Sequence, residues 1–308
     1  MADRSGVTLE RMRSFVRVAE RGSLSAVARE QGVGQSTITR HVAELEQALG
    51  VSLLSRTTRR VTLTEEGTRY HDEARTILRL VDEATDEARH AGGEPMGKVR
   101  LSCTGALGVR HVMRGLFDLQ DRYPGIAVDL SLSDERVDLV RDAVDVAVRL
   151  GPLGDSALQR RHIGFSRRIL VASRGYLAHA GRLEAPEDLG RHDAIRMGNI
   201  AGSETLPLHD ASGKVKRASF SGRLVVDHGL AAREALIAGR GIAAAHLWLV
   251  DDLLASGEVE QVLPAYDVEP VPLSLLFVPA RARIARVRLV IDAVAILLEE
   301  IPGIDRSR

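Results

Sequence analysis

The sequence predicts a multidomain protein in which a small helical domain is joined by one long helix to an α/β domain with two lobes. Three observations predict this fold class. Apolar residues recur every three or four positions in three short segments before residue 50. One longer pattern of the same kind then runs through residues 64–91. From Lys98 onward, strand-like and helix-like segments alternate, as is typical of α/β domains.

Composition and charge set the broad class of protein. The 308 residues leave room for more than one domain, and 44% hydrophobic with 27% charged residues is typical of a globular protein. The 42 basic residues balance 42 acidic ones, so only local charge can indicate a polyanionic partner. We see neither a long apolar segment nor a signal peptide, and we expect a cytoplasmic protein without membrane association. The single cysteine, Cys103, excludes an internal disulfide.

Residues 1–63 are predicted to form a helix-turn-helix domain with a β-hairpin. Thr8 can cap a first helix that ends at Gly22, and the segment SLSAVAREQ predicts a short second helix. After the turn GVG, a third helix begins near Gln35, with Ile38, Val42, Leu45 and Leu49 on one face. Three helices with a tight glycine-containing turn make a helix-turn-helix. The stretch VSLLSRTTRRVTLT predicts the hairpin wing that follows.

Residues 64–91 are predicted to form a dimerisation helix, capped by Thr64. Such a helix of about 28 residues is roughly 42 Å long, too long to bury its apolar stripe against the small domain before it. We therefore expect a second copy of the chain as its partner. The stripe has the a/d spacing of a coiled coil and consists of Tyr70, Ala74, Ile77, Val81, Ala84 and Ala88.

Residues 92–97 are predicted to be a hinge, and residues 98–304 an α/β domain. VRLSC, IAVDLSL and DVAVRLG are expected to be strands, and the segments LGVRHVMRGLFDLQDRYPG and DERVDLVRD helices. A parallel sheet with helices on both faces is the default for such a series. The chain crosses near GFSRRILVAS into a second unit and returns at VPLSLLFVP. We expect lobe I at about 98–165 and 269–304, lobe II at about 166–268, and a cleft between them.

The stretch FVRVAERGSLSAVAREQGVGQSTITRHVAELEQALGVSLLSRTTRRVTLTEEG resembles the LysR-type transcriptional regulators. Further similarity lies in GKVRLS, DRYPGIAVDLSLSD, DVAVRLG and EALIAGRGIAA. The resemblance implies a winged helix-turn-helix, a dimerising linker helix and a two-lobed effector domain like the type 2 periplasmic binding proteins. It also implies dimers that pair into tetramers on double-stranded DNA near a promoter, contact with RNA polymerase if the protein is an activator, and control by a small-molecule effector bound between the lobes.

The third helix carries the residues expected to contact DNA. Its first turns enter the major groove in this motif, and Gly34 stands where the family commonly has a serine cap. The wing supplies positive charge, because no acidic residue occurs between Gln47 and Thr64. The alternative is a solvated helix face with capping hydroxyls. The expected contacts are Gln35, Ser36, Thr37, Thr39, Arg40 and His41 on the helix, and Arg56, Arg59 and Arg60 on the wing.

The effector residues follow from the resemblance and lie near strand ends in both lobes: Ser102, Cys103, Thr104, Ser133, Arg149, Met197, Asp227, His228 and His246. Hydroxyls and free N–H groups at the helix start after Cys103 favour an anion. Asp227 instead favours a donor-bearing or cationic ligand. Capping explains Ser102 and Thr104 equally well, and Asp227 and His246 can also be satisfied surface or hinge residues.

Two other functions remain as alternatives. A cysteine-dependent enzyme would use Cys103 with His111, His228 or His246 as its base, but no third group is evident to orient the histidine. A solute-binding protein would leave the N-terminal third unexplained. GRGIAA follows a helix and precedes a strand, which is the reverse of a dinucleotide site. We identify no metal-ligand spacing and predict no cofactor.

Overall fold

The computed structural model describes residues 6–56, 61–89, 94–135, 138–139, 142–153, 158–198 and 203–307. The chain divides into two compact units, Met1–Gly93 and Glu94–Arg308. Each unit packs around its own hydrophobic core. Within the described residues, none of the helices combines the length and apolar character that crossing a membrane requires.

Three short helices begin the N-terminal unit: α1 (Leu9–Arg21), α2 (Leu24–Gln31) and α3 (Gln35–Leu49). The predicted caps are present, because the Thr8 hydroxyl accepts the Arg11 N–H and the Ser23 hydroxyl accepts the Ala26 N–H. The glycines that end the helices, including Gly22, have positive φ angles, which only glycine adopts without strain. The predicted helix-turn-helix is confirmed.

A small hairpin of β1 (Leu54–Arg56) and β2 (Val61–Leu63) follows α3. The Glu46 carboxylate on α3 holds its start by accepting the N–H groups of Leu53 and Leu54 at 2.7 and 3.0 Å. At its other end the Thr64 hydroxyl donates to the Ser52 carbonyl and accepts the Gly67 N–H. The wing is therefore tied to both α3 and the next helix, α4.

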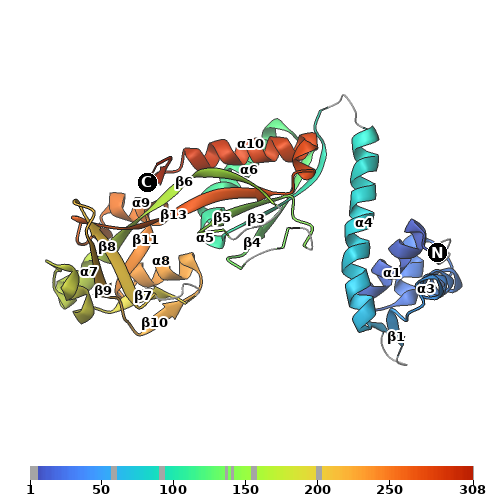
Figure 1. Cartoon of the computed structure of the whole chain (residues 1–308), viewed down its shortest axis with the longest axis horizontal. Helices are drawn as coiled ribbons and strands as arrows, with labels where there is room; N and C mark the ends of the chain where they lie inside the picture. Colours follow the sequence, from blue (N-terminus) through green and yellow to red (C-terminus); the bar gives the residue numbers. More distant parts are fainter. Residues whose placement is uncertain are drawn as a thin grey trace. The chain divides into compact units, whose positions relative to one another are not determined.

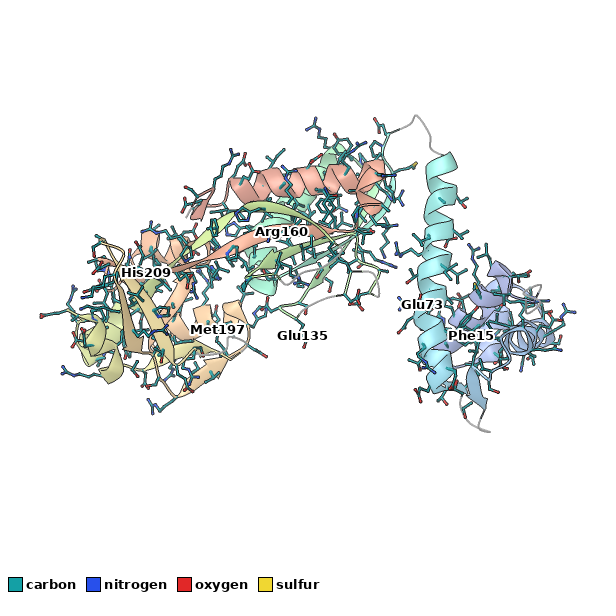
Figure 2. All side chains as sticks on the ribbon, in the orientation of Figure 1. Phe15, Glu73, Glu135, Arg160, Met197 and His209 are labelled. Atoms are coloured by element: carbon teal, nitrogen blue, oxygen red, sulfur yellow. The ribbon has the colours of Figure 1, made fainter. Side chains whose placement is uncertain are left out.

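The long helix α4 (Glu65–Arg89) runs beside α1 (Figure 1). Phe15, labelled in Figure 2, is fully buried on α1 and packs against Tyr70 of α4 with ring centroids 5.8 Å apart. Ala74 and Leu78 of α4 belong to the same core. The first part of α4 is thus held by the domain that precedes it.

Three parallel strands form the centre of lobe I: β3 (Gly97–Cys103), β4 (Ile126–Leu132) and β5 (Val146–Leu150). A continuous helical segment joins β3 to β4. It consists of α5 (Gly105–Leu107), the π-helical turn η1 (Gly108–Val112) and α6 (Met113–Arg122). The final helix α10 (Ala285–Glu299) lies beside α6 (Figure 1).

Lobe II has a second group of parallel strands, β7 (Ala194–Met197), β10 (Leu224–Val226) and β11 (Ile242–His246). Its helices are α7 (Arg174–Ala180), η2 (Pro186–Arg191), α8 (Gly229–Ile237) and α9 (Leu247–Ser256). The remaining short elements of the C-terminal unit, from both lobes, are β8 (Thr205–Asp210), β9 (Val215–Ser219), β12 (Val259–Gln261), η3 (Arg281–Arg283) and β14 (Ile304–Asp305).

Two long strands connect the lobes, β6 (Gln159–Ser173) and β13 (Tyr266–Phe277) (Figure 1). They pair with each other antiparallel, and the main strand order is β10-β7-β11-β6-β13-β5-β3-β4. The default of an all-parallel sheet is therefore wrong at its middle, where two crossing strands of opposite direction join two parallel halves. The two-lobed α/β fold is confirmed.

One expected helix is not seen among the residues that the structure describes. DERVDLVRD was predicted to be helical, but the described residues Asp134, Glu135, Asp138, Leu139 and Asp142 form bends, turns or irregular chain. Leu139 is buried with Val144 and Ala147 in a small separate core. Val137 and Val140, the other apolar residues of this segment, lie outside the described residues, so only the burial of Leu139 is known.

Gly67 lies at the junction between the wing and α4, where there is no room for a methyl group. An added Cβ at Gly67 would lie 1.9 Å from the Leu53 carbonyl oxygen, and that carbonyl accepts the Thr64 N–H. We expect Gly67→Ala to lower the free energy of unfolding of the N-terminal unit by about 1–3 kcal/mol, measured by urea denaturation. Glu66→Ala, an exposed position one residue earlier, is the control, with an expected loss under about 1 kcal/mol. Equal losses in the two variants would contradict this account.

Candidate DNA interface and effector site

The outer face of α3 carries five polar side chains near its start. Gln35, Ser36 and Arg40 are exposed, and Thr37 and Thr39 are half-buried. Within the described part of the chain, none of these five side chains forms a hydrogen bond or an ion pair. Gly34 precedes the helix without a side-chain cap, so backbone N–H groups of the first turn are also available. This surface can offer donors, acceptors and one positive charge to an external partner.

His41 does not lie on this outer face. His41 is 8% exposed, and its Nδ1 is 2.9 Å from the hydroxyl oxygen of Ser14, which is fully buried on α1. Nε2 lies 3.7 Å from the Glu10 carboxylate. The expectation that His41 faces outward is therefore wrong: the imidazole joins the recognition helix to α1. The helical turn that sends Ile38 and Val42 inward also sends the intermediate position 41 towards α1.

The expected wing contacts are only partly described. Arg56 ends β1 opposite Val61, but its side chain lies outside the described residues. Arg59 and Arg60 also lie outside the described residues. Their contact with DNA stays a prediction from sequence. Glu46, which sequence reasoning missed, anchors the start of this wing to α3.

The residues predicted to form the dimerisation stripe on α4 do not all face the same surroundings. Ala74 is fully buried in the core of its own chain, and Tyr70 packs on Phe15. Ala74 therefore has no surface left for a second copy, and the prediction is wrong at that position. Further along the helix, Ile77 and Leu80 are 40% and 47% exposed. Val81 is half-buried, Ala84 is exposed, and the side chain of Ala88 lies outside the described residues.

In lobe I the structure brings five of the predicted effector residues together. The carboxyl ends of parallel strands meet at one edge of a sheet, which is where α/β proteins bind ligands. The Arg149 guanidinium donates to the Ser102 hydroxyl and to the Ser133 carbonyl, both at 2.8 Å. Ser102 and Cys103 precede Thr104 at the end of β3. Arg149 and Ser102 are buried, and burial lowers the pKa of Arg149.

In lobe II, three of the predicted residues lie at the corresponding strand ends. Met197, labelled in Figure 2, ends β7 in register with Val226 of β10. Asp227 follows Val226 as an exposed residue. His228 caps α8, since its Nδ1 accepts the Leu230 N–H at 3.2 Å. Its Nε2 packs against Gly105 of lobe I, where an added Cβ would lie 2.2 Å away. His228 therefore belongs to the contact between the lobes.

His246 belongs to a different cluster, built around the only tryptophan in the chain. The His246 ring stacks on Trp248 at 5.2 Å between centroids, and its Nδ1 lies 2.7 Å from the Ser166 hydroxyl on β6. The Trp248 indole N–H donates to the same hydroxyl, and His111 of lobe I reaches the Trp248 carbonyl at 3.1 Å. Burial lowers the pKa of His246 to about 3. The uncharged imidazole thus helps to fix the lobes at the crossing strand.

Arg110 makes a further direct contact between the lobes. From the π-helical turn of lobe I it pairs with Asp251 and Asp252 of α9 at 3.3 and 3.0 Å. Within lobe II, Arg233 of α8 pairs with the same Asp252 at 2.6 Å and so helps to position that carboxylate. Sequence reasoning missed the contact of Arg110, because charges 141 positions apart give no local pattern.

The neutral His246 predicts a specific pH dependence. In the unfolded chain a histidine has a pKa near 6.5, so between about pH 6.5 and 3 the unfolded state binds the extra proton. The free energy of unfolding of the effector domain should therefore fall as pH is lowered through this range. His246→Asn keeps an acceptor for Ser166 but cannot titrate, and we expect a shallower slope. Urea denaturation followed by circular dichroism at pH 7, 6, 5 and 4 measures this; identical slopes would contradict a buried neutral imidazole.

Comparison with known families identifies both units. Residues 9–68 match the family "Bacterial regulatory helix-turn-helix protein, lysR family". Residues 92–297 match the "LysR substrate binding domain". The first match spans the three helices and the wing, and the second spans both lobes. Together they cover the outer face of α3 and the strand ends of both lobes.

Similar proteins and solved structures support the same family assignment. The HTH-type transcriptional activator AaeR of Escherichia coli (strain K12) is 32% identical over 286 residues, 92% of this chain and 92% of that protein. The full-length structure of the Vibrio cholerae virulence activator AphB has a TM-score of 0.64 at 29% identity, covering 94% of this chain and 98% of that one. CrgA from Neisseria meningitidis has a TM-score of 0.61 at 30% identity, with the same coverage. The chain belongs to the LysR family of transcriptional regulators, with a helix-turn-helix DNA-binding domain followed by an effector-binding domain.

Proposed function

We propose that this LysR-type regulator recognises its operator with the outer face of α3, and that Gln35, Ser36, Thr37, Thr39 and Arg40 make the contacts. The observation that carries the proposal is that these five neighbouring side chains have no partner within the described part of the chain. In a helix-turn-helix, the start of this helix enters the major groove. His41 is not among the contacts, because it is buried against α1.

The chemistry of each side chain suits a different part of the DNA. Gln35 can pair with adenine through its amide, and the methyl groups of Thr37 and Thr39 can contact thymine. Ser36 and the backbone N–H groups at the helix start suit phosphate. Arg40 suits a phosphate or a guanine. With Arg56, Arg59 and Arg60 on the wing, these residues supply local positive charge in a chain whose net charge is zero.

Two copies are required, because one chain offers few DNA contacts. We propose that residues 1–63 bind DNA, that residues 64–91 pair two chains, and that residues 92–97 connect them to residues 98–304. Ile77 and Leu80 expose apolar surface on a helix whose neighbouring Leu78 is already buried. A second α4 is the partner that suits this face, and pairing of dimers would give a tetramer. If the protein is an activator, RNA polymerase is a further partner.

A small effector is proposed to bind where β3, β4 and β5 end, beside the start of α8. It would alter the DNA-bound state by shifting the relative pose of the lobes. We propose no catalytic step. Burial raises the pKa of Cys103 to about 12, so the thiolate that a cysteine nucleophile needs is not formed near neutral pH. Because the target is DNA, we expect the protein to work in the cytoplasm.

Two variants of α3 should separate the overall affinity for DNA from the discrimination between DNA sequences. Arg40→Ala should weaken binding to all sequences about tenfold and make the slope of log K against log salt less steep by about 1 if it removes a phosphate contact. Gln35→Ala should instead reduce discrimination between operator variants by about 1–3 kcal/mol at one base pair. Fluorescence anisotropy on operator fragments at several salt concentrations measures both. Arg191→Ala in lobe II is the control, and a salt-independent affinity would refute the proposal.

Pairing through α4 can be tested by placing a charge on its exposed apolar face. Leu80→Glu should weaken self-association at least tenfold, because a carboxylate would be buried against the second helix. Thr85→Glu adds the same charge about 140° around the helix and should have little effect. Sedimentation equilibrium of the full-length chain measures both variants. Equal association of the two variants would show that this face is not the interface.

A further inference from the structure

Lobe II contains an open cavity at the amino ends of its parallel strands. The cavity has a volume of about 560 Å³ and lies where β7 and β10 begin, between α7 and the residues that follow η2. Met197 and Asp227 of the predicted effector site lie at the carboxyl ends of the same strands, roughly 10 Å away along β7. Helix α7 is at the end of lobe II that is remote from lobe I (Figure 1). The cavity is therefore separate from the cleft between the lobes.

One wall of the cavity is a close backbone contact between the chain before β10 and the start of β7. The Ala194 N–H donates to the Ser221 carbonyl at 3.0 Å, and an added Cβ at Gly222 would lie 2.1 Å from the Ala194 carbonyl oxygen. A glycine allows this approach because it has no Cβ. The contact places Arg223 beside Asp193, with 3.2 Å between the guanidinium nitrogen and the carboxylate oxygen. The position of Arg223 at the cavity is thus set by the backbone.

His192 lines the cavity and has an imidazole nitrogen without a partner. The residue is 9% exposed, and its ring packs against Tyr176 with centroids 5.7 Å apart. Its Nδ1 lies 3.1 Å from the Tyr176 hydroxyl oxygen. Within the described part of the chain, Nε2 has no hydrogen-bond partner. Polar groups of buried side chains are normally paired, so an unused nitrogen at a cavity wall indicates a ligand.

The Tyr176 hydroxyl determines where this imidazole carries its proton. The hydroxyl oxygen accepts the Asp193 N–H at 3.0 Å. Burial raises the pKa of Tyr176, so the hydroxyl keeps its own proton near neutral pH and can donate it to Nδ1 of His192. When Nδ1 accepts, the proton of a neutral imidazole is on Nε2. A protonated imidazole also has a proton there, so Nε2 is a donor in either state.

Two guanidinium groups line the same cavity. The side chains of Arg191 and Arg223 are 84% and 92% exposed, and each has one carboxylate nearby, Asp188 at 3.6 Å and Asp193 at 3.2 Å. Exposed ion pairs of this kind contribute little free energy, so a ligand can take over both guanidinium groups. Among the described residues that line the cavity, Asp193 is the only acid. The donors outnumber it, and charged donors select an anionic acceptor.

We propose that this cavity is a second ligand site, separate from the effector site, and that it binds the phosphate group of a small organic phosphate ester. The three terminal oxygens of a phosphate can accept from Arg191, Arg223 and Nε2 of His192 at once, whereas a carboxylate has two oxygens. A volume of about 560 Å³ is within the roughly 300–1,000 Å³ of small-molecule sites, so the cavity also has room for the organic part.

Glucose 6-phosphate is the probe of this site, and glucuronate and glucose are comparisons that carry a carboxylate and no charge. Each would be titrated into the full-length protein without DNA by isothermal titration calorimetry, in chloride buffer at equal ionic strength. Glucose 6-phosphate should bind at least tenfold more tightly than glucuronate, and glucose should not bind measurably at 10 mM. Inorganic phosphate should bind at least threefold more weakly than glucose 6-phosphate, because it lacks the organic part.

The arginines are tested by paired variants. Arg223→Gln should weaken binding of glucose 6-phosphate at least fivefold, because it removes a charge at the cavity. Arg217→Gln removes the charge of another exposed arginine of lobe II, which is on β9 and does not line the cavity, and should change binding less than twofold. Arg191→Ala should weaken binding at least threefold while operator DNA is bound as by the unaltered chain, because the cavity lies outside the N-terminal unit.

The imidazole is tested by two amides. His192→Asn keeps an acceptor near the Nδ1 position for Tyr176 but has no group at the Nε2 position. Binding of glucose 6-phosphate should therefore weaken at least threefold with an unchanged unfolding temperature. His192→Gln, whose amide reaches the Nε2 position, should recover most of that loss.

Four results would overturn the inference. They are equal binding of glucose 6-phosphate and glucuronate, equal binding of glucose 6-phosphate and inorganic phosphate, equal effects of Arg223→Gln and Arg217→Gln, and no binding of glucose 6-phosphate at 10 mM. The proposed DNA contacts are tested separately, because the Gln35 and Arg40 variants are measured on DNA without any phosphate ester. Intact DNA recognition with a failed glucose 6-phosphate series would reject only the second ligand site.

Discussion

The pairing of β6 with β13 is the constraint on which the effector domain depends. Each strand runs through both lobes, so the lobes share one sheet and cannot separate. Their pairing changes register twice, between Val268 and Val271 and between Leu273 and Ser274. Such irregularities bend and twist a sheet locally. The two parallel halves on either side therefore bring their carboxyl ends together, as the contact of His228 with Gly105 shows, and the predicted effector residues lie at these ends.

Contacts between the lobes are polar and specific at the two ends of this junction. His228 meets Gly105 near the proposed effector site, while Ser166, His246 and Trp248 form a hydrogen-bonded cluster on the crossing strand. The cluster is anchored by buried, uncharged groups, which are costly to break because each would lose its partner.

In the N-terminal unit one small core has to position the helix that carries the proposed DNA contacts. Phe15 on α1 is shared with α4, and His41 on α3 bonds to Ser14 of the same helix α1. Helices α3 and α4 are therefore both fixed against α1. A domain this small has few buried residues, so side chains at the edge of a stripe are drawn inward. That is why His41 and Ala74, which looked available from their spacing, are not.

The sequence by itself determined the order of the domains, the bounds of the strongest helices, the wing and the strand ends that carry Ser102, Ser133 and Arg149. These features depend on periodicity, caps and turns, each of which involves only residues that are close together in the sequence. It did not determine which way intermediate positions face, that the middle of the sheet is antiparallel, or that Asp134 reaches the Gly105 N–H. Only the tertiary structure decided these, because each depends on segments far apart in the chain whose contacts leave no local pattern.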